Sequence, residues 1–359
     1  MEAIQEWPEP IVRVQTLADA QVIPDRYIKP PSQRPNLNPG TPSSPPTGEA
    51  VNIPVIDLGG LSGSAAAKQA SMLAVSNACR DWGFFQVVNH GVSPELMRRV
   101  REAWREFFYL PLEAKQAYAN SPATFEGYGS RIGVQKGAIL DWSDYFFLHL
   151  LPRSIKNCDK WPALPASLRE TTESYGGELA KLCGVIQSVM SMTLGLDEEF
   201  LSREFGEAGA CLRVNFYPKC PQPDLTLGLS PHSDPGGMTI LLADERVRGL
   251  QVRKGDAWIT VDPVPNAFIV NIGDQIQVLT NATYKSVEHR VIVNAATERI
   301  SLAFFYNPQD DLLIKPAEEL VAPYTSALYK PMSFKEYKMY MRMVGPRGKS
   351  QVDSMKLVA

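Results

Sequence analysis

Cysteine is scarce in this sequence: five of 359 residues, at positions 79, 158, 183, 211 and 220, with no C-x-x-C spacing. An odd number argues against a disulfide framework, and the spacing argues against a zinc cluster. The N-terminus, MEAIQEWPEP, lacks the apolar core of a signal peptide, and no later run reaches the roughly 18 apolar residues of a membrane span. We therefore predict a soluble intracellular protein with reduced thiols, located in the cytoplasm, with the nucleus as an alternative location.

A large excess of charge of one sign is also missing. The 36 basic and 39 acidic residues give a net charge of -3 and are spread along the chain. Such a balance creates no field that would attract nucleic acid or an anionic membrane. The expected partner is a small-molecule substrate, with no obligate protein partner. Because 44% of the residues are apolar, the chain can bury a large core.

Residues 1–50 are predicted to form an arm followed by a linker. A short helix is expected at VQTLADA. Residues 29–50 combine prolines with Ser, Thr, Gly and Asn, a composition that favours extended, solvated chain. We interpret residues 29–50 as a surface linker.

Residues 51–205 are predicted to alternate strands with helices. NIPVIDL and WGFFQVVNHG have the composition of strands, the second of them buried. Ser93 is a good N-cap, Pro94 suits the first helical position, and apolar residues follow at four-residue spacing, so a helix is predicted from Pro94 to Tyr109. Further helices are predicted over 65–79 and 175–194.

Residues 206–312 have a different texture, with short β-type runs separated by Pro, Gly, Asn and Asp. Several such runs predict a barrel or a double-sheet jelly roll. The runs are CLRVNFYP, GLQVRKG, WITVDPV, AFIVNIGD, KSVEHRVIVN and RISLAFFYNP. In residues 313–359, the apolar helix SFKEYKMYMRMV is expected to pack outside the barrel or over its mouth.

Two of the four histidines stand in contexts that suit a metal site: His232 with Asp234 in LSPHSDPGG, and His289 in SVEHRVIVN. On a strand, side chains two apart face the same side, so His232 and Asp234 can reach one ion while His289 arrives from a distant strand. Two imidazoles and one carboxylate leave coordination positions open, as Fe(II) oxygenases require for a co-substrate and dioxygen. His90, in an Asn-His-Gly turn, is expected to be structural, and His149, within FFLHLLP, a packing histidine.

Two predicted strands turn polar side chains to one face. Along RISLAFF, alternation places Arg299, Ser301 and Phe305 together, and an arginine with a hydroxyl can hold a carboxylate. Polar side chains inside a barrel are costly unless they meet a ligand or each other, so the pattern predicts a polar ligand. The second strand, CLRVNFYP, carries the set Arg213, Asn215 and Tyr217.

The motifs N-F-Y-P, P-H-S-D, H-R-V and R-I-S-L-A-F-F, with IPVIDL and WGFFQVVNHG nearer the N-terminus, resemble the plant 2-oxoglutarate-dependent dioxygenases. The resemblance implies a mixed α/β fold, a double-stranded β-helix (jelly roll) core with flanking helices. It also implies an enzyme that uses Fe(II), 2-oxoglutarate and O2, with ascorbate in support. By the same resemblance, the residues with assigned roles are His232, Asp234 and His289 for iron, Arg299 and Ser301 for the distal carboxylate of 2-oxoglutarate, and Asn215 and Tyr217 in support of that co-substrate.

Within this group, the sequence is similar to the jasmonate-induced oxygenases (jasmonic acid oxidases) in EWPEPIVRVQ, PDRYIKP, YGSRIGVQKGAILDWSDYFFLHLLP and ACLRVNFYPKCP. The similarity implies hydroxylation of jasmonic acid to 12-hydroxyjasmonate, which lowers the active hormone and so down-regulates jasmonate defence signalling. It implies apolar pocket walls at Phe147 and Phe305, and a substrate carboxylate held by Arg213 and Arg342. Lys338 stands where relatives carry arginine.

Lys338 and Arg342 are four residues apart on the predicted C-terminal helix, so both can lie on one face as a two-cation clamp. A lysine presents a point ammonium in place of a planar guanidinium, which changes how a carboxylate is recognised.

Structural alternatives exist for most of these residues. Asn215 and Tyr217 could satisfy hydrogen bonds within the barrel, and Arg213 could form an internal ion pair. The clamp could be a solvated helix face, and the two phenylalanines ordinary core aromatics.

Two other functions are also compatible with the sequence. One is the same chemistry on a flavonoid, as in anthocyanidin and flavonol synthases, or on another plant acid. The other is a non-catalytic jelly-roll binding protein. A neutral polyphenol would need no cationic clamp, so the basic residues distinguish an acid substrate from a flavonoid.

Overall fold

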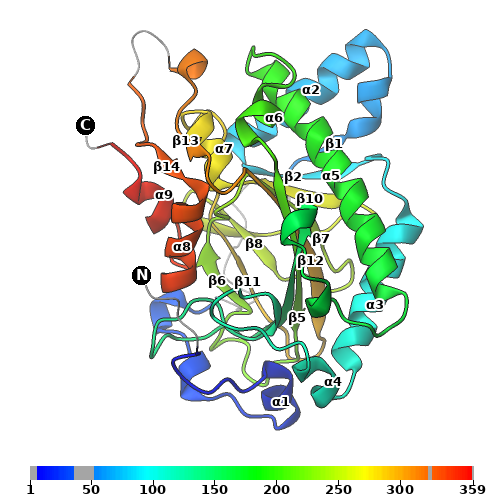
Figure 1. Ribbon diagram of the computed structural model, residues 1–359, viewed down its shortest axis with the longest axis vertical. Helices are drawn as coiled ribbons and strands as arrows, with labels where there is room; N and C mark the ends of the chain where they lie inside the picture. Colours follow the sequence, from blue (N-terminus) through cyan, green and yellow to red (C-terminus); the bar gives the residue numbers. More distant parts are fainter. Residues whose placement is uncertain (1–5, 36–51, 322–325, 358–359) are drawn as a thin grey trace.

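A computed structural model of the chain describes residues 6–35, 52–321 and 326–357. Among the helices of these residues, none combines the length and the apolar character needed to cross a membrane. The described residues form two facing β-sheets with helices packed on the outside, which confirms the predicted mixed α/β double-stranded β-helix (Figure 1).

The main sheet has eight strands in the described residues and mixes strands from both of the predicted central regions, 51–205 and 206–312, so these regions share one core. Its strands, in spatial order, are β1 (Val55–Asp57), β2 (Phe84–Val88), β10 (Phe268–Ile272), β7 (Met238–Leu242), β12 (Arg299–Asn307), β5 (Gly209–Tyr217), β4 (Asp144–Leu151) and β3 (Gly127–Gly129).

The second sheet is smaller and carries part of the predicted metal site. Its strands, in spatial order, are β6 (Leu229–His232), β11 (His289–Val291), β8 (Leu250–Lys254) and β9 (Ala257–Thr260). A separate short pair joins β13 (Leu313–Ile314) to β14 (Met332–Ser333). The predicted β-type runs are therefore confirmed as strands, although β11 is much shorter than the run KSVEHRVIVN.

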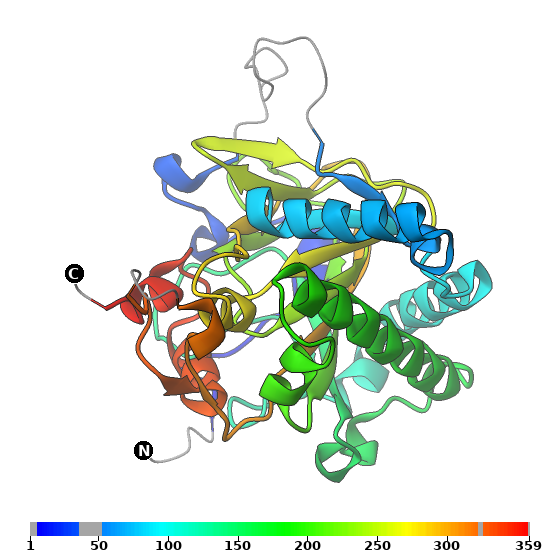
Figure 2. The same cartoon turned by 90° about the horizontal axis from the view of Figure 1, so that it is seen from above.

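Three long helices cover the outer face of the main sheet (Figures 1 and 2): α2 (Ala65–Asp81), α3 (Pro94–Tyr109) and α5 (Leu168–Thr193). The predicted helix from Pro94 to Tyr109 is confirmed at both ends, and α5 begins earlier than predicted. The remaining helices are α1 (Val14–Asp19), α4 (Leu112–Gln116), α6 (Phe200–Phe205), α7 (Asp274–Leu279), α8 (Phe334–Val344) and α9 (Ser350–Ser354).

The apolar stripe of α3 supplies much of the contact with the sheet. Val100, Trp104 and Phe108 are fully buried, as their four-residue spacing predicts. Phe108 stacks on Phe216 of β5, with ring centroids 4.9 Å apart. The Trp104 indole N–H donates to Thr172 of α5 at 3.1 Å, so it ties the two helices together while remaining paired in the core.

The C-terminal helix α8 is fixed at both its start and its buried side. Ser333 and Glu336 form a capping box at its N-terminus. Tyr337 is buried, and its hydroxyl donates to Asp274 at 2.6 Å, which also accepts from Ser233 at 3.0 Å. The helix is thereby attached to the loop after β6, and its other face lies at the mouth of the barrel, as predicted.

The surface-linker prediction is wrong for Lys29, the first residue of the predicted linker, whereas Pro31, Ser32 and Gln33 are exposed as predicted. Lys29 is buried; it forms an ion pair with Asp141 at 2.8 Å and donates to Ser230 at 2.9 Å. Two partly buried partners for its ammonium hold Lys29 in the interior despite the solvated character predicted for its proline-rich surroundings. The rest of the predicted linker, 36–50, lies outside the described residues.

Replacing Trp104 with alanine should lower the free energy of unfolding by about 3–5 kcal/mol, because the change leaves a cavity between α3 and α5 and an unpaired Thr172 hydroxyl. Urea denaturation followed by circular dichroism would measure it. Leu73→Ala, at a half-exposed position of α2, is the control and should change the value by about 0.5 kcal/mol or less. Equal losses in both variants would contradict the packing described for α3.

Candidate active site

His232, Asp234 and His289 come together between the sheets, as the sequence predicts. His232 is the last residue of β6 and pairs across the sheet with His289, the first residue of β11. The Oδ1 atom of Asp234 lies 3.5 Å from Nε2 of His232 and 3.7 Å from Nε2 of His289. All three side chains are buried, and one ligand atom from each lies within 4.8 Å of the others.

The predicted reason for the position of Asp234 is wrong, because this residue lies beyond the end of β6 and not on the strand. Two hydrogen bonds orient it instead. The Thr239 hydroxyl donates to Oδ2 at 2.5 Å, and the Asn271 amide donates to the same oxygen at 2.8 Å. Oδ1 is thus left to face the imidazoles. The sequence analysis missed Thr239 and Asn271, whose signal is a single polar residue in each of the apolar strands MTILL and FIVNI.

The two imidazoles are oriented by the backbone. Nδ1 of His232 lies 2.9 Å from the Ser230 carbonyl, and Nδ1 of His289 lies 3.2 Å from the Val287 carbonyl. Since a carbonyl oxygen only accepts, each Nδ1 is the donor, and each Nε2 presents its lone pair toward Asp234 when the ring is neutral.

Burial and mutual charge set the protonation of this cluster. Burial raises the pKa of Asp234. The two histidines and the Thr239 hydroxyl lower it by a larger amount, so the pKa lies below its usual value. Burial and the neighbouring His232 lower the pKa of His289 to about 4. A charged carboxylate and an unprotonated imidazole therefore lie together at neutral pH. This donor set fits Fe(II), because two histidines and one carboxylate leave positions for other ligands.

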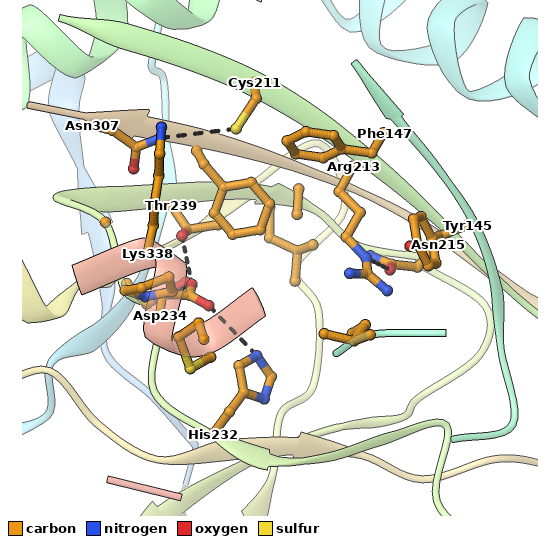
Figure 3. A pocket seen from close by; sticks show the side chains of 18 of the residues that line it. Tyr145, Phe147, Cys211, Arg213, Asn215, His232, Asp234, Thr239, Asn307 and Lys338 are labelled. Carbon is orange, nitrogen blue, oxygen red and sulfur yellow. Dashed lines mark hydrogen bonds and ion pairs between the residues drawn. The ribbon is translucent and has the colours of Figure 1, made fainter. Parts of the chain in front are cut away.

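A cavity of about 270 Å³ extends from these three residues between the sheets to α8 (Figure 3). Arg299 and Ser301 of β12 line it, and the Arg299 Nη1 lies 3.4 Å from the Ser301 hydroxyl. The Nε of Arg299 is buried without a hydrogen-bond partner among the described residues. A buried guanidinium with an unused donor beside a hydroxyl fits a carboxylate ligand such as that of 2-oxoglutarate.

Arg213 of β5 faces the same cavity and forms no ion pair within the described residues, so the alternative of an internal ion pair is not supported. Its guanidinium lies 3.9 Å from the ring centroid of Tyr145, and its Nε donates to Asn215 at 2.7 Å (Figure 3). Its Nη2 is buried without a partner in the described part of the chain. Tyr217 also lines the cavity, with its ring 5.1 Å from the guanidinium of Arg299.

The predicted clamp residues Lys338 and Arg342 both line the cavity from α8, which argues against a fully solvated helix face. They differ in their partners. The Lys338 ammonium lies 2.5 Å from both carboxylate oxygens of Asp310, whereas Arg342 makes a long contact of 3.5 Å with the carbonyl of Thr124. The sequence analysis missed Asp310.

Phe147 and Phe305 both line the cavity, and their role as apolar walls for a substrate stays a prediction. His149 lines it as well, beside Phe147 with ring centroids 5.1 Å apart, so the interpretation as a packing histidine is incomplete. Burial, together with the charges of Lys338 and Arg342, lowers the pKa of His149 to about 4, which keeps it neutral at neutral pH.

His90 lies outside the cavity. Its Nε2 is 2.9 Å from the carbonyl of Asn266, in agreement with the predicted structural role.

Comparisons with known proteins agree with this geometry. Residues 208–308 match the 2OG-Fe(II) oxygenase superfamily, and residues 53–164 match the N-terminal region described as non-haem dioxygenase in morphine synthesis. Jasmonate-induced oxygenase 2 of Arabidopsis thaliana is 60% identical over 98% of this chain and 95% of its own length. Jasmonate-induced oxygenase 1 of the same plant is 59% identical over 98% and 87%.

Among solved structures, a crystal structure of JOX2 in complex with 2OG, Fe and JA superposes with a TM-score of 0.91 at 59% identity, and the match covers 98% of this chain and 100% of that one. With this identity over nearly the whole chain, the protein belongs to the 2-oxoglutarate- and Fe(II)-dependent oxygenases and, among them, to the jasmonate-induced oxygenase family.

Proposed function

We propose that this oxygenase hydroxylates jasmonic acid to 12-hydroxyjasmonate, and so lowers the active hormone and down-regulates jasmonate defence signalling. The observation that carries the proposal is the cavity itself, which is lined both by the His232, Asp234 and His289 cluster and by two guanidinium groups, of Arg213 and Arg299, that each have a buried nitrogen without a partner in the described residues. The related structure that contains 2OG, Fe and JA supports the same assignment.

The site residues divide into three sets. His232, Asp234 and His289 would hold Fe(II). Arg299 and Ser301 would hold the distal carboxylate of 2-oxoglutarate, supported by the neighbouring β5 residues Asn215 and Tyr217. The proposed substrate contacts are Phe147, Phe305, Arg213, Arg342 and Lys338.

When bound, Fe(II) with 2-oxoglutarate and O2 supplies the oxidising chemistry that converts a C–H bond into C–OH, with ascorbate in support. The protein supplies position. Arg213 and Arg342 would fix the acid group at one end, which directs the pentenyl tail toward the metal end. Phe147 and Phe305 exclude water around the tail.

A flavonoid substrate is the second candidate, because related oxygenases such as a flavonoid 7-O-demethylase of Ocimum basilicum share 39% identity with this chain. A neutral ring system would leave the buried Nη2 of Arg213 without an anion. The unfavourable free energy of leaving the Arg213 guanidinium without an anion favours an acid as the substrate. A non-catalytic binding role does not fit an oxygenase family member whose cavity contains the complete His, Asp, His cluster.

A cytoplasmic location, with the nucleus as the alternative, is part of the proposal. All five cysteines are free, as expected in a reducing compartment.

The protein is reconstituted anaerobically with Fe(II) and 2-oxoglutarate, given jasmonic acid and then exposed to oxygen. We expect a product one oxygen atom heavier and an equal amount of succinate, both measured by mass spectrometry.

Arg213→Gln should lower kcat/KM for the acid by about 30-fold or more, because a charge pair with the substrate is lost.

Arg290→Gln is the matched control for Arg213→Gln. Arg290 is also buried, lies 4.3 Å from the ring of Trp258 and donates through Nε to Gln251, but it does not line the cavity. Turnover of a flavonoid without turnover of jasmonic acid would keep the oxygenase chemistry and reject the substrate.

Arg299→Gln should raise the KM for 2-oxoglutarate by about 10- to 100-fold, because charge-assisted hydrogen bonds to the co-substrate carboxylate are lost. Initial rates of succinate formation at varied 2-oxoglutarate would measure the change. The affinity for jasmonic acid should stay near that of the wild type. A KM for 2-oxoglutarate that does not move would assign the co-substrate to another cation.

Thr239→Val should weaken Fe(II) binding by about 10- to 100-fold, because Asp234 loses a hydrogen bond that orients it. Anaerobic competition with a fluorescent chelator would measure the affinity. Thr226→Val is the control, since the Thr226 hydroxyl is buried without a partner among the described residues. The assignment of Asp234 as an oriented ligand would be wrong if both variants bound Fe(II) equally well.

A further inference from the structure

Asp310 and Lys338 form an ion pair in the wall of the cavity. Asp310 follows β12 in the chain, Lys338 lies on α8, and both line the cavity. The ammonium lies 2.5 Å from each carboxylate oxygen of Asp310. The Lys338 side chain is 23% exposed and that of Asp310 is 47% exposed, so water only partly screens the pair.

The other two cations of the predicted clamp, Arg213 and Arg342, form no ion pair in the described residues. Arg213 donates to the neutral amide of Asn215 and keeps one buried nitrogen unused, and Arg342 has a long contact with the Thr124 carbonyl and lies 5.8 Å from the ring centroid of Phe125. Burial lowers the pKa of both guanidinium groups, and the negative charge of Asp310 offsets only part of that shift at Arg342.

Two titratable groups that line the cavity near the pair, His149 and Cys211, are uncharged at neutral pH. His149 has a pKa near 4, for the reasons given above, and burial raises the pKa of the Cys211 thiol to about 12. Of the acidic residues that line the described cavity, Asp234 belongs to the metal cluster, and Asp310 alone lies beside the clamp. The carboxylate of Asp310 therefore pairs with the Lys338 ammonium, which would otherwise be available to the carboxylate of an acid substrate.

We propose that Asp310 is a specificity-determining residue: by pairing with Lys338, it leaves Arg213 and Arg342 as the two cations that receive the substrate carboxylate. This inference rests on the proposed function and refines it. The ion pair sets the positive charge available in this wall of the cavity and weakens the advantage of an anionic substrate over a neutral analogue of the same shape.

The inference separates two possible roles of Lys338. If Lys338 binds the substrate directly, its loss is harmful whether or not Asp310 is present. If Lys338 chiefly neutralises Asp310, its loss leaves an unpaired carboxylate near the substrate carboxylate, and removing Asp310 as well relieves the repulsion. A double-mutant cycle distinguishes the two.

The experiment is calorimetric titration of full-length protein loaded anaerobically with Fe(II) and 2-oxoglutarate, so that binding occurs without turnover. The probes are jasmonic acid and its uncharged methyl ester. The variants are Asp310→Asn, Lys338→Gln and the double variant, with Asp310→Ser as a second replacement of the carboxylate. Asp311→Asn is the matched control, since Asp311 lies next in the chain and pairs with Lys335 of α8 at 3.6 Å, with both side chains largely exposed.

Asp310→Asn and Asp310→Ser should bind jasmonic acid about 2- to 5-fold more tightly than the wild type, a range set by the partial exposure of the pair. Lys338→Gln should bind it more weakly, and the double variant should return to within about 2-fold of the wild type. The methyl ester should bind all variants alike, and Asp311→Asn should behave as the wild type.

A double variant as weak as Lys338→Gln would overturn the inference, and so would unchanged acid affinity in both Asp310 variants. Wild-type protein that binds 2-oxoglutarate but not jasmonic acid would instead reject the proposed function, and this inference with it.

Discussion

The pairing of β5 with β12 decides which side chains reach the cavity. The register places Tyr217 opposite Arg299 and Asn215 opposite Ser301. Because side chains alternate along a strand, one register directs all the polar members of both strands inward and their apolar neighbours toward the helices. A slip by one residue would bury Arg299 against the apolar helices and turn Ile300 into the cavity. The packing of α3 and α5 against the sheet stabilises this register, because these helices cover the apolar face of β5, which must therefore point outward.

Among the described residues, the cavity combines a buried carboxylate that hydrogen bonds hold toward two imidazoles with guanidinium groups that form no ion pair. Arg213 and Arg299 retain unused donors, and Asp234 is held with one oxygen directed at two imidazoles. Buried charge without a partner is unfavourable, so the fold tolerates these groups because its ligands complete them. The unpaired guanidinium nitrogens are thus the groups available to anionic ligands, and the His232, Asp234 and His289 cluster is the group available to a metal.

Much of this arrangement was predictable because it is periodic or carried by short motifs. Alternation along β5 and β12 identified the inward-facing residues, and capping with four-residue spacing identified α3. Asp234 was found, but its placement in a loop and its two hydrogen bonds depend on tertiary contacts. Thr239 and Asn271 look like ordinary strand residues in the sequence, and pairing across the barrel gives them their role.

Other features depend on contacts between distant segments and have no local signal. The composition around Lys29 predicts solvated chain, yet its ammonium meets Asp141 and Ser230 in the folded protein. Asp310 and Lys338 meet because a turn after β12 faces one side of α8. His149 lies in an apolar run that gives no indication of the cavity. Sequence patterns identify which face of an element is buried, but not which charges from separate elements become neighbours.

The attachment of α8 has a consequence for how substrate preference can change. Tyr337 anchors the helix through Asp274, while the adjacent Lys338 points into the cavity. Successive residues of a helix point about 100° apart, so the anchor at Tyr337 and the proposed recognition side at Lys338 lie on different faces of one helix. A residue on the recognition side can be exchanged, as lysine for arginine, without loosening the anchor. The contacts that hold α8 in place are separate from the side chains that face the cavity. Substitutions on the cavity side of α8 can therefore change which acid is bound while the attachment of the helix stays constant.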